Sequence, residues 1–207
     1  MFKRLSRVPL LLLALSVTSS PSLAAGSSAP AQQLVEDTTL GVLDEIRSNR
    51  RRYSEGSREL HGLIKEAVFP HFDFELMGRR VLSRSWRAAS SGQRDAFLVQ
   101  LRLMMLHTYA AALVTYADGD VHFLGRKPGR SADEVVVRTV VTRPGTPELP
   151  INYSMCLHDD RWKVYDVTVD GVSLVVNYRA SFASKVKKNG LDALIDELTE
   201  RNETRGE

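Results

Sequence analysis

One acidic residue in apolar surroundings has the clearest catalytic potential in this sequence. Asp166 stands between Tyr165 and Val167. Burial in such surroundings raises the pKa of a carboxyl group, which lets it act as a general base, as in isomerases of cone-like α+β fold. An acid that caps a helix or pairs with an arginine explains the same position, and we favour this structural interpretation. An enzyme that acts on a lipid-like substrate, with Asp166 as general base, is the alternative function.

The other reactive residue types lack the partners that catalysis or metal binding requires. Gly171-Val172-Ser173 has neither the second flanking glycine nor the strand–elbow context of a hydrolase nucleophile. His71-Phe72-Asp73 offers too few ligands for a metal. Cys156 alternates with apolar residues, which is typical of a small core residue, and as the only cysteine it cannot form an intramolecular disulfide. We therefore expect no catalytic residue, no metal site and no cofactor.

The N-terminus has the pattern of a secretory signal peptide. Basic residues precede an apolar run over residues 8–17, and small residues follow at Ser22 and Ala24. The run is about half of the roughly 20 residues that span a bilayer, which disfavours a membrane anchor. We expect residues 1–24 to be removed near Ala24, which leaves a soluble exported protein.

Removal of this segment changes the charge of the chain. Residues 1–24 hold three of the 28 basic residues and none of the 25 acidic ones, so the mature chain would be neutral. A general nucleic-acid-binding protein carries a net basic surface. The composition therefore predicts no nucleic-acid partner.

Hydrophobic periodicity predicts helices on both sides of a block of strands. Helical spacing covers residues 34–49, 60–68, 71–86, 93–116, 172–188 and 191–198. Alternating or β-branched segments joined by short links cover residues 121–124, 134–142, 151–157 and 161–169. The expected fold class is α+β, with a curved antiparallel sheet of about four strands and helices packed on one face around an apolar cleft. We expect a flexible leader over 25–33, a single domain over 34–202 and a tail over 203–207.

An ordered set of short segments resembles a known family. These segments are Phe72–Trp86, Gln93–Phe97 with Thr108-Tyr109, Trp162–Val167, Asp170–Val175, Asn177–Phe182 and Gly190–Leu194. Together they resemble the MlaC-type, or toluene-tolerance auxiliary substrate-binding, family of periplasmic phospholipid carriers over residues 34–200. The sequence departs from the family pattern at Ser83, where glycine is expected, and at Leu101, where phenylalanine is expected. Both positions bear on packing or pocket shape, and hence on lipid preference.

The resemblance implies a function, a ligand and partners. Such proteins shuttle phospholipid across the periplasm between an outer-membrane lipoprotein complex and an inner-membrane ABC transporter with an MCE-domain subunit, and so maintain outer-membrane lipid asymmetry. A cleft of this kind needs flexible apolar side chains beyond those of the core, and methionine supplies them. We predict a lipid-binding lining of Met77, Leu82, Phe97, Leu101, Met104, Met105, Tyr109, Ile151, Tyr153, Met155, Val175 and Phe182.

Two residues are candidates for the head group, and two interpretations compete with the carrier. Tyr178 and Arg179 lie where the last strand gives way to helix, and could approach a phosphate at the mouth of the cleft; a solvated helix face also explains them, and we favour that interpretation. Ordinary core packing explains each of the predicted lining residues. An adaptor that bridges envelope proteins, with a dry and fully packed interior, is a third function.

Overall fold

The fold was obtained as a computed structural model that describes residues 29–206. The expected signal peptide and the first residues of the expected leader lie outside the described residues. Helix α1 (Ala29–Ser48) begins inside the expected leader, which corrects that boundary. Ala31 is fully buried against the sheet, and the side chain of Gln32 donates to Glu36 one turn later at 2.6 Å. This burial and hydrogen bonding explain why the helix starts before the region of clear apolar periodicity.

Five antiparallel strands form one open sheet in the order β1-β2-β3-β4-β5. The strands are β1 (Asp120–Pro128), β2 (Glu134–Thr142), β3 (Leu149–His158), β4 (Arg161–Val169) and β5 (Val172–Ser173). Four of them are the predicted meander, and β5 is a short addition that pairs with the end of β4. The register places Tyr153 between Val137 and Val167, so apolar side chains from three strands share one face. The α+β prediction is confirmed.

The edge strand β1 is irregular. Its pairing with β2 shifts between Phe123 and Arg126, around Gly125 at φ 79°. This positive φ suits glycine, and a bulge here bends the strand. Lys127 and Pro128 complete the strand beyond the bulge.

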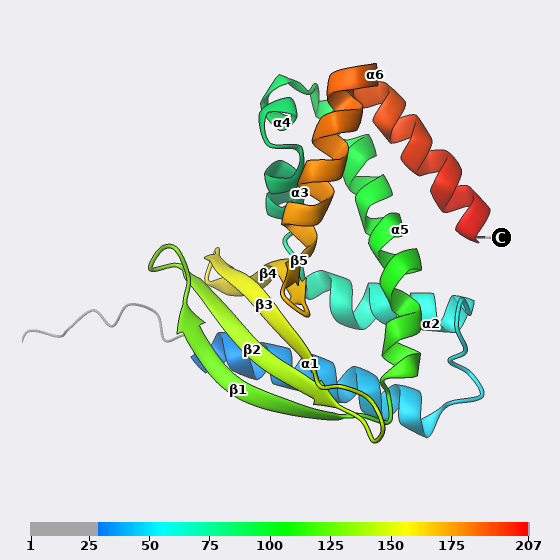
Figure 1. The fold of residues 1–207 in the computed structure, drawn as a ribbon, viewed down its shortest axis with the longest axis vertical. Coiled ribbons are helices and arrows are strands. Elements are labelled where there is room, and N and C mark those ends of the chain that lie inside the picture. Colours follow the sequence, from blue (N-terminus) through cyan, green and yellow to red (C-terminus); the bar gives the residue numbers. More distant parts are fainter. Residues whose placement is uncertain (1–28, 207) are drawn as a thin grey trace, which may run out of the picture.

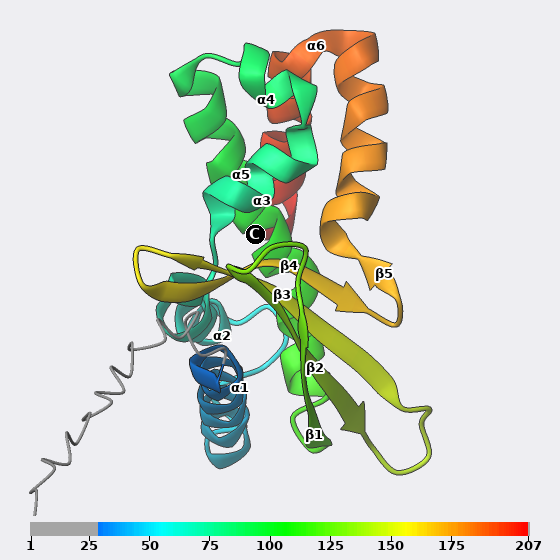
Figure 2. The same ribbon diagram turned by 90° about the vertical axis from the view of Figure 1, so that its left-hand side faces the viewer.

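The remaining helices stand on one side of the sheet, and most are collected in a bundle (Figures 1 and 2). They are α2 (Arg58–Leu63), the π-helix η1 (Ile64–Val68), the 3₁₀ helix η2 (Phe69–His71), α3 (Phe74–Leu82), α4 (Arg84–Ala88), α5 (Ser91–Thr115) and α6 (Leu174–Gly206). Two predicted helices are therefore subdivided. The helix expected over 60–68 changes from α to π winding, and the one expected over 71–86 is interrupted at Ser83, whose φ is 52°.

Side-chain caps fix the start of the long central helix. Ser90 accepts a hydrogen bond from the backbone N–H of Gln93 at 3.1 Å, and the Gln93 side chain accepts one from the Ser90 N–H at 3.0 Å. This capping box satisfies two N–H groups that the helix itself leaves free. Among the described residues, α5 alone is long and apolar enough to cross a membrane by length and composition. In this fold it is the central helix, and it packs against α3 and α6.

The C-terminal helix is bent back on itself. Gly190 adopts φ 87° and ψ 172°, which separates α6 into two arms. Asn202 in the second arm is buried, and its side chain donates to the backbone oxygen of Gln100 on α5 at 3.0 Å. Residues 203–206 of the expected tail belong to α6, and Arg205 donates to Thr108 on α5 at 3.4 Å.

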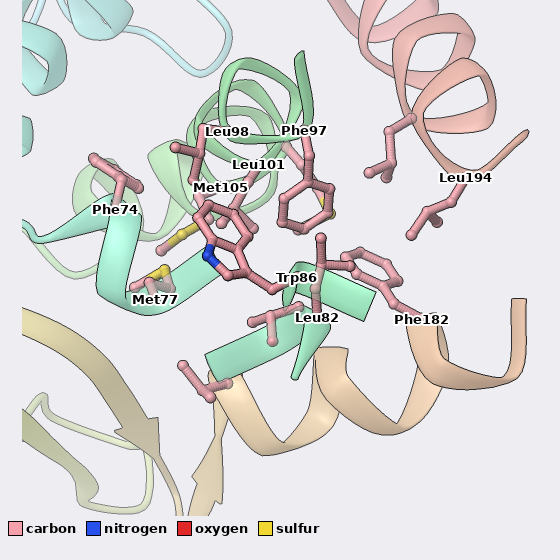
Figure 3. Packing of buried hydrophobic residues seen from close by; sticks show 14 of the residues in the cluster. Phe74, Met77, Leu82, Trp86, Phe97, Leu98, Leu101, Met105, Phe182 and Leu194 are labelled. Atoms are coloured by element: carbon pink, nitrogen blue, oxygen red, sulfur yellow. The ribbon is translucent and has the colours of Figure 1, made fainter. Parts of the chain in front are cut away.

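The buried residues between α3, α4, α5 and α6 form one group that we call the helical cluster (Figure 3). Close approach of the helices at its centre depends on Gly78. A Cβ atom at this position would lie 2.6 Å from Cδ2 of Leu98 and 3.2 Å from the ring of Trp86. The helical cluster is therefore a closely packed core at this point.

Candidate functional site

A cavity of about 300 Å³ lies between α1, the sheet and the C-terminal half of α5. Apolar side chains make most of its wall, and none of the lining residues is Asp, Glu, Lys or Arg. Its polar side chains are those of Thr38, Thr39, His71, Tyr109, Tyr116 and Tyr153. An apolar chamber with a few fixed hydroxyl groups suits a ligand that is largely hydrocarbon.

The sheet supplies one side of the cavity through the shared face of three strands. Ile151, Tyr153 and Met155 alternate along β3 and all line it. Val167 of the neighbouring strand β4 pairs with Tyr153 and also lines the cavity. The period of two along a strand explains why this face could be identified from the sequence.

Five of the twelve predicted lining residues line this cavity. They are Met105 and Tyr109 on α5 and Ile151, Tyr153 and Met155 on β3. The other seven lie in the helical cluster instead and do not line the cavity as it stands; they are Met77, Leu82, Phe97, Leu101, Met104, Val175 and Phe182. Phe97 of α5 and Phe182 of α6 are neighbours in this cluster (Figure 3), and their rings pack edge to face with centroids 6.0 Å apart.

The opposite wall of the cavity was not anticipated. Leu34, Val35 and Val42 of α1 line it, together with Val68 and Phe69 of the η1–η2 segment. The α1 residues follow helical spacing, so a signal for an apolar face was present in the sequence, but nothing in that spacing showed that the face meets β3. A π-helix in the wall is notable, because such windings are frequent at functional sites.

Tyr153 of β3 lines the cavity and connects the sheet to α1. Its hydroxyl forms hydrogen bonds with Thr39 and Thr139. Thr139 in turn donates to the backbone oxygen of Ile151 at 2.8 Å. Burial raises the pKa of Tyr153, and the two threonine hydrogen bonds lower it by less. The phenol is therefore neutral and committed to protein partners.

The two predicted head-group residues lie in different surroundings. The Tyr178 hydroxyl lies 3.2 Å from the hydroxyl of Tyr109, which lines the cavity. Burial and this hydrogen bond raise the pKa of Tyr109, so its phenol is neutral. Arg179 is exposed, and its Nε donates to the backbone oxygen of Arg80 at 2.7 Å. The structure thus brings Tyr178 to the cavity-lining helix and uses Arg179 as a link between α6 and α3.

Asp166 has hydrogen-bond partners for both carboxylate oxygens. Oδ2 accepts from the hydroxyl of Ser173 at 2.6 Å, and Oδ1 accepts from the backbone N–H of Val175 at 3.0 Å. Ser173 also accepts from the N–H of Val176 at 3.1 Å. These bonds satisfy N–H groups at the first turn of α6, which is the capping role expected of Asp and Ser at a helix start. Asp166 does not line the cavity, so this geometry supports the structural interpretation.

A half-buried ion pair holds α3 against the sheet. Nη2 of Arg80 lies 2.6 Å from Oε1 of Glu134, and the Tyr165 hydroxyl donates to Oε2 of Glu134 at 3.0 Å. Burial acts to raise the pKa of Glu134, but the hydrogen bonds from Arg80 and Tyr165 outweigh it and lower that pKa below its ordinary value. Glu134 is therefore a stable carboxylate that joins β2 to α3.

Cys156 is buried beside two carboxylates. Its Sγ lies 3.9 Å from Oδ2 of Asp73, which caps α3 by accepting from the N–H of Leu76 at 2.8 Å. Burial, with the charges of Asp73 and Glu134, raises the pKa of the Cys156 thiol to about 11. A thiol of this kind is a poor nucleophile at neutral pH. The core interpretation of Cys156 accords with this environment.

A histidine pair lies outside the cavity wall. The rings of His61 on α2 and His107 on α5 have centroids 5.3 Å apart. Burial is the main cause that lowers the pKa of each ring, and nearby positive charge, including Lys65, adds to it. Within residues 29–206 no group of three or more His, Cys, Asp or Glu residues is arranged to hold a metal ion.

Comparison with known proteins identifies relatives of similar length and fold. The protein is 20% identical over 168 residues to the intermembrane phospholipid transport system binding protein MlaC of Haemophilus influenzae, which covers 80% of this chain and 78% of the relative. It is 24% identical over 181 residues to the toluene tolerance protein ttg2D of Pseudomonas putida, with 85% and 82% covered. The phospholipid-binding protein of Ralstonia solanacearum, solved in complex with a phospholipid, matches with a TM-score of 0.79 and 25% identity.

The match to the Ralstonia structure covers 86% of this chain and 100% of the solved one. The α+β architecture described above is therefore that of a phospholipid-binding protein seen with its ligand. Residues 36–200 match the sequence model of the family described as MlaC protein, which spans well over half of the chain. The resemblance inferred from the sequence is confirmed, and the chain belongs to the MlaC family.

Proposed function

We propose that the mature protein is a periplasmic shuttle that binds a phospholipid, with the acyl chains in the cavity between α1, the sheet and α5. The observation that carries this proposal is the wall of that cavity, which is apolar and contains no charged residue. The phospholipid in the related Ralstonia structure supports the same class of ligand. Family membership supports the proposed partners, an outer-membrane lipoprotein complex and an inner-membrane ABC transporter with an MCE-domain subunit.

The energetics of such a ligand require a wall that moves. Each buried methylene contributes about 0.8 kcal/mol, so two chains of roughly fifteen methylenes represent on the order of 20 kcal/mol before costs. A shuttle must also release its ligand, so an opening cost has to offset much of this gain. The cavity, at about 300 Å³, lies at the small end of ligand pockets. We propose that the helices open against the sheet when the protein docks on a membrane complex.

The seven predicted lining residues in the helical cluster fit into this proposal as a reserve of apolar surface. Met77 and Met104 are almost completely buried there, and methionine changes shape at low cost. If the helices separate from the sheet, such residues can contact acyl chains that the closed cavity cannot hold. Their lipid contact is therefore part of the proposal, as is the maintenance of outer-membrane lipid asymmetry by the shuttle.

The experiment that tests ligand binding is native mass spectrometry of mature protein purified from the periplasm without detergent. We expect adducts of phospholipid mass that disappear on denaturation and are recovered in an organic extract. A bare protein that takes up no phospholipid from vesicles would contradict the carrier and favour the adaptor with a dry interior. Transfer of labelled lipid between vesicles that contain the two partner complexes then tests the shuttle. The control uses the same lipid-binding protein with vesicles that lack the complexes.

A further inference from the structure

A pair of tyrosine hydroxyl groups gives the cavity wall one unused hydrogen-bond donor. Tyr109 and Tyr178 lie with their hydroxyl oxygens 3.2 Å apart, and no other group among the described residues hydrogen-bonds to either one. Each phenol carries one O–H donor. Whichever hydroxyl donates within the pair, one proton is left without an acceptor. The remaining hydroxyl is also strengthened as a donor when its oxygen already accepts a hydrogen bond.

The Tyr109–Tyr178 pair lies at the boundary between the apolar cavity and the solvent. Tyr109 lines the cavity and is half-buried, and Tyr178 is half-buried at the start of α6. The residues that flank Tyr178 in the helix, Asn177 and Arg179, are exposed. The pair therefore lies where a ligand with buried chains and an exposed polar end would pass from hydrocarbon to polar atoms.

The chemistry of the site selects a neutral acceptor. The wall of the cavity contains no arginine or lysine, and the pair offers hydroxyl groups as hydrogen-bond donors. A phosphate placed there would lose hydration without gaining a cation, which is costly. An ester carbonyl is a neutral acceptor, and in a diacyl glycerolipid it lies between the acyl chains and the head group.

We propose that the Tyr109–Tyr178 pair binds an ester carbonyl of a diacyl glycerolipid through its spare O–H. This inference rests on the proposed function, because it names how the ligand is recognised in the same cavity. Recognition at the ester linkage is independent of the head group. The carrier then distinguishes diacyl from dialkyl ether lipids and accepts different head groups.

The test measures competition binding of two lipids to delipidated mature protein. The lipids are a 1,2-diacyl and a 1,2-dialkyl phosphatidylglycerol with the same chain length, and the comparison is repeated with phosphatidylethanolamine. One neutral hydrogen bond predicts a preference for the ester of about 3- to 10-fold, with either head group. We expect this preference to disappear in the double variant Y109F/Y178F. That variant removes both hydroxyls together, so no buried partner is left unpaired.

A matched control separates the pair from tyrosines in general. Tyr116 also lines the cavity, directly after the last residue of α5, and the guanidinium of Arg143 lies 5.4 Å from the centroid of its ring. We expect Tyr116→Phe to keep the ester preference. Equal binding of ester and ether lipids by the unaltered protein would overturn the inference while leaving the carrier function intact, as would a preference that persists in the double variant. Failure to bind either lipid would instead contradict the proposed function.

Discussion

Arg80 on α3 and Glu134 on β2 form a half-buried ion pair with 2.6 Å between nitrogen and oxygen. The same guanidinium lies 4.0 Å from the ring centroid of Tyr165 on β4, so one arginine contacts two strands. Arg179 on α6 also donates a hydrogen bond to the backbone oxygen of Arg80. The contact therefore connects the sheet, α3 and α6, which are the parts proposed to separate during lipid exchange.

Replacement of Glu134 by Gln is expected to weaken this connection. This ion pair is partly buried, so its energy lies between those of exposed and fully buried pairs. Removal of one charge is expected to lower the free energy of unfolding by roughly 1–3 kcal/mol. We expect a lower free energy of unfolding by denaturant and faster release of bound lipid to vesicles. Unchanged release together with lower stability would show that the pair stabilises the fold but does not resist opening. Glu148, in the segment before β3, offers an exposed Glu→Gln control.

The same carboxylate makes stability depend on pH on the acid side. Hydrogen bonds lower the folded-state pKa of Glu134 below its ordinary value of 4.5, despite the opposing effect of burial. A lowered pKa stabilises the folded protein above the unfolded value, and this contribution is lost as the pH falls through the folded value. Denaturant titrations at and below pH 4.5 should therefore show a shallower loss of stability in Glu134→Gln than in the unaltered protein. Parallel curves for the two proteins would contradict this prediction.

The histidine pair predicts a second pH dependence at higher pH. The pKa of both His61 and His107 is lowered from 6.5, mainly by burial, so folding favours the neutral rings. The stabilisation that this provides is present above pH 6.5 and is lost as the pH falls through the folded values. We expect the double variant H61Q/H107Q to flatten the stability profile between about pH 5 and 7. His122, exposed on β1, serves as the control His→Gln position, and a profile that flattens with that variant instead would contradict the assignment.

Asp166 offers a direct distinction between a cap and a catalytic group. Asp166→Ala removes the acceptor for Ser173 and for the N–H of Val175, and loss of such a cap costs about 1–2 kcal/mol. Because Asp166 lies outside the cavity wall, the amount of bound lipid per folded protein should not change. Thermal unfolding and native mass spectrometry of the same sample measure both quantities. Loss of lipid at unaltered stability would show that the carboxylate contacts the ligand after all.

Two leucines on α5 allow the cavity and the packed core to be tested separately. Leu113 lines the cavity, whereas Leu101 is fully buried in the helical cluster. We expect Leu113→Trp to fill the cavity and reduce the lipid content with little change in stability. Leu101→Trp should overpack the cluster and cost about 1–3 kcal/mol, while the folded fraction keeps its lipid. The reverse pattern would locate the bound chains within the helical cluster instead of the cavity.

The sequence predicted the strands of this fold more accurately than the helices. The β2 and β4 boundaries agree with the structure, because β-branched runs between turn residues have few alternatives. The segment over residues 60–68 has helical spacing, but spacing does not distinguish α from π winding. The break at Ser83 was missed for a related reason, since no glycine or proline marks its positive φ of 52°.

Prediction of the site succeeded where a local period determines the face. Alternation along β3 identified Ile151, Tyr153 and Met155 as neighbours of one chamber. Helix α5 is apolar around most of its circumference, so periodicity could not show that Met105 lines the cavity whereas Met104, its neighbour in the helical cluster, does not. That distinction depends on which elements pack against each side, and only the tertiary structure provides it.

The irregular edge at β1 has a consequence for how the sheet can be extended. An exposed edge strand is a template on which another copy can add a strand and so begin a polymer. Here the bulge at Gly125 turns the edge, charged side chains follow it, and Pro128 has no N–H to offer an incoming strand. Growth of the sheet by addition of further copies is thereby discouraged at this side, which removes one route to polymerisation.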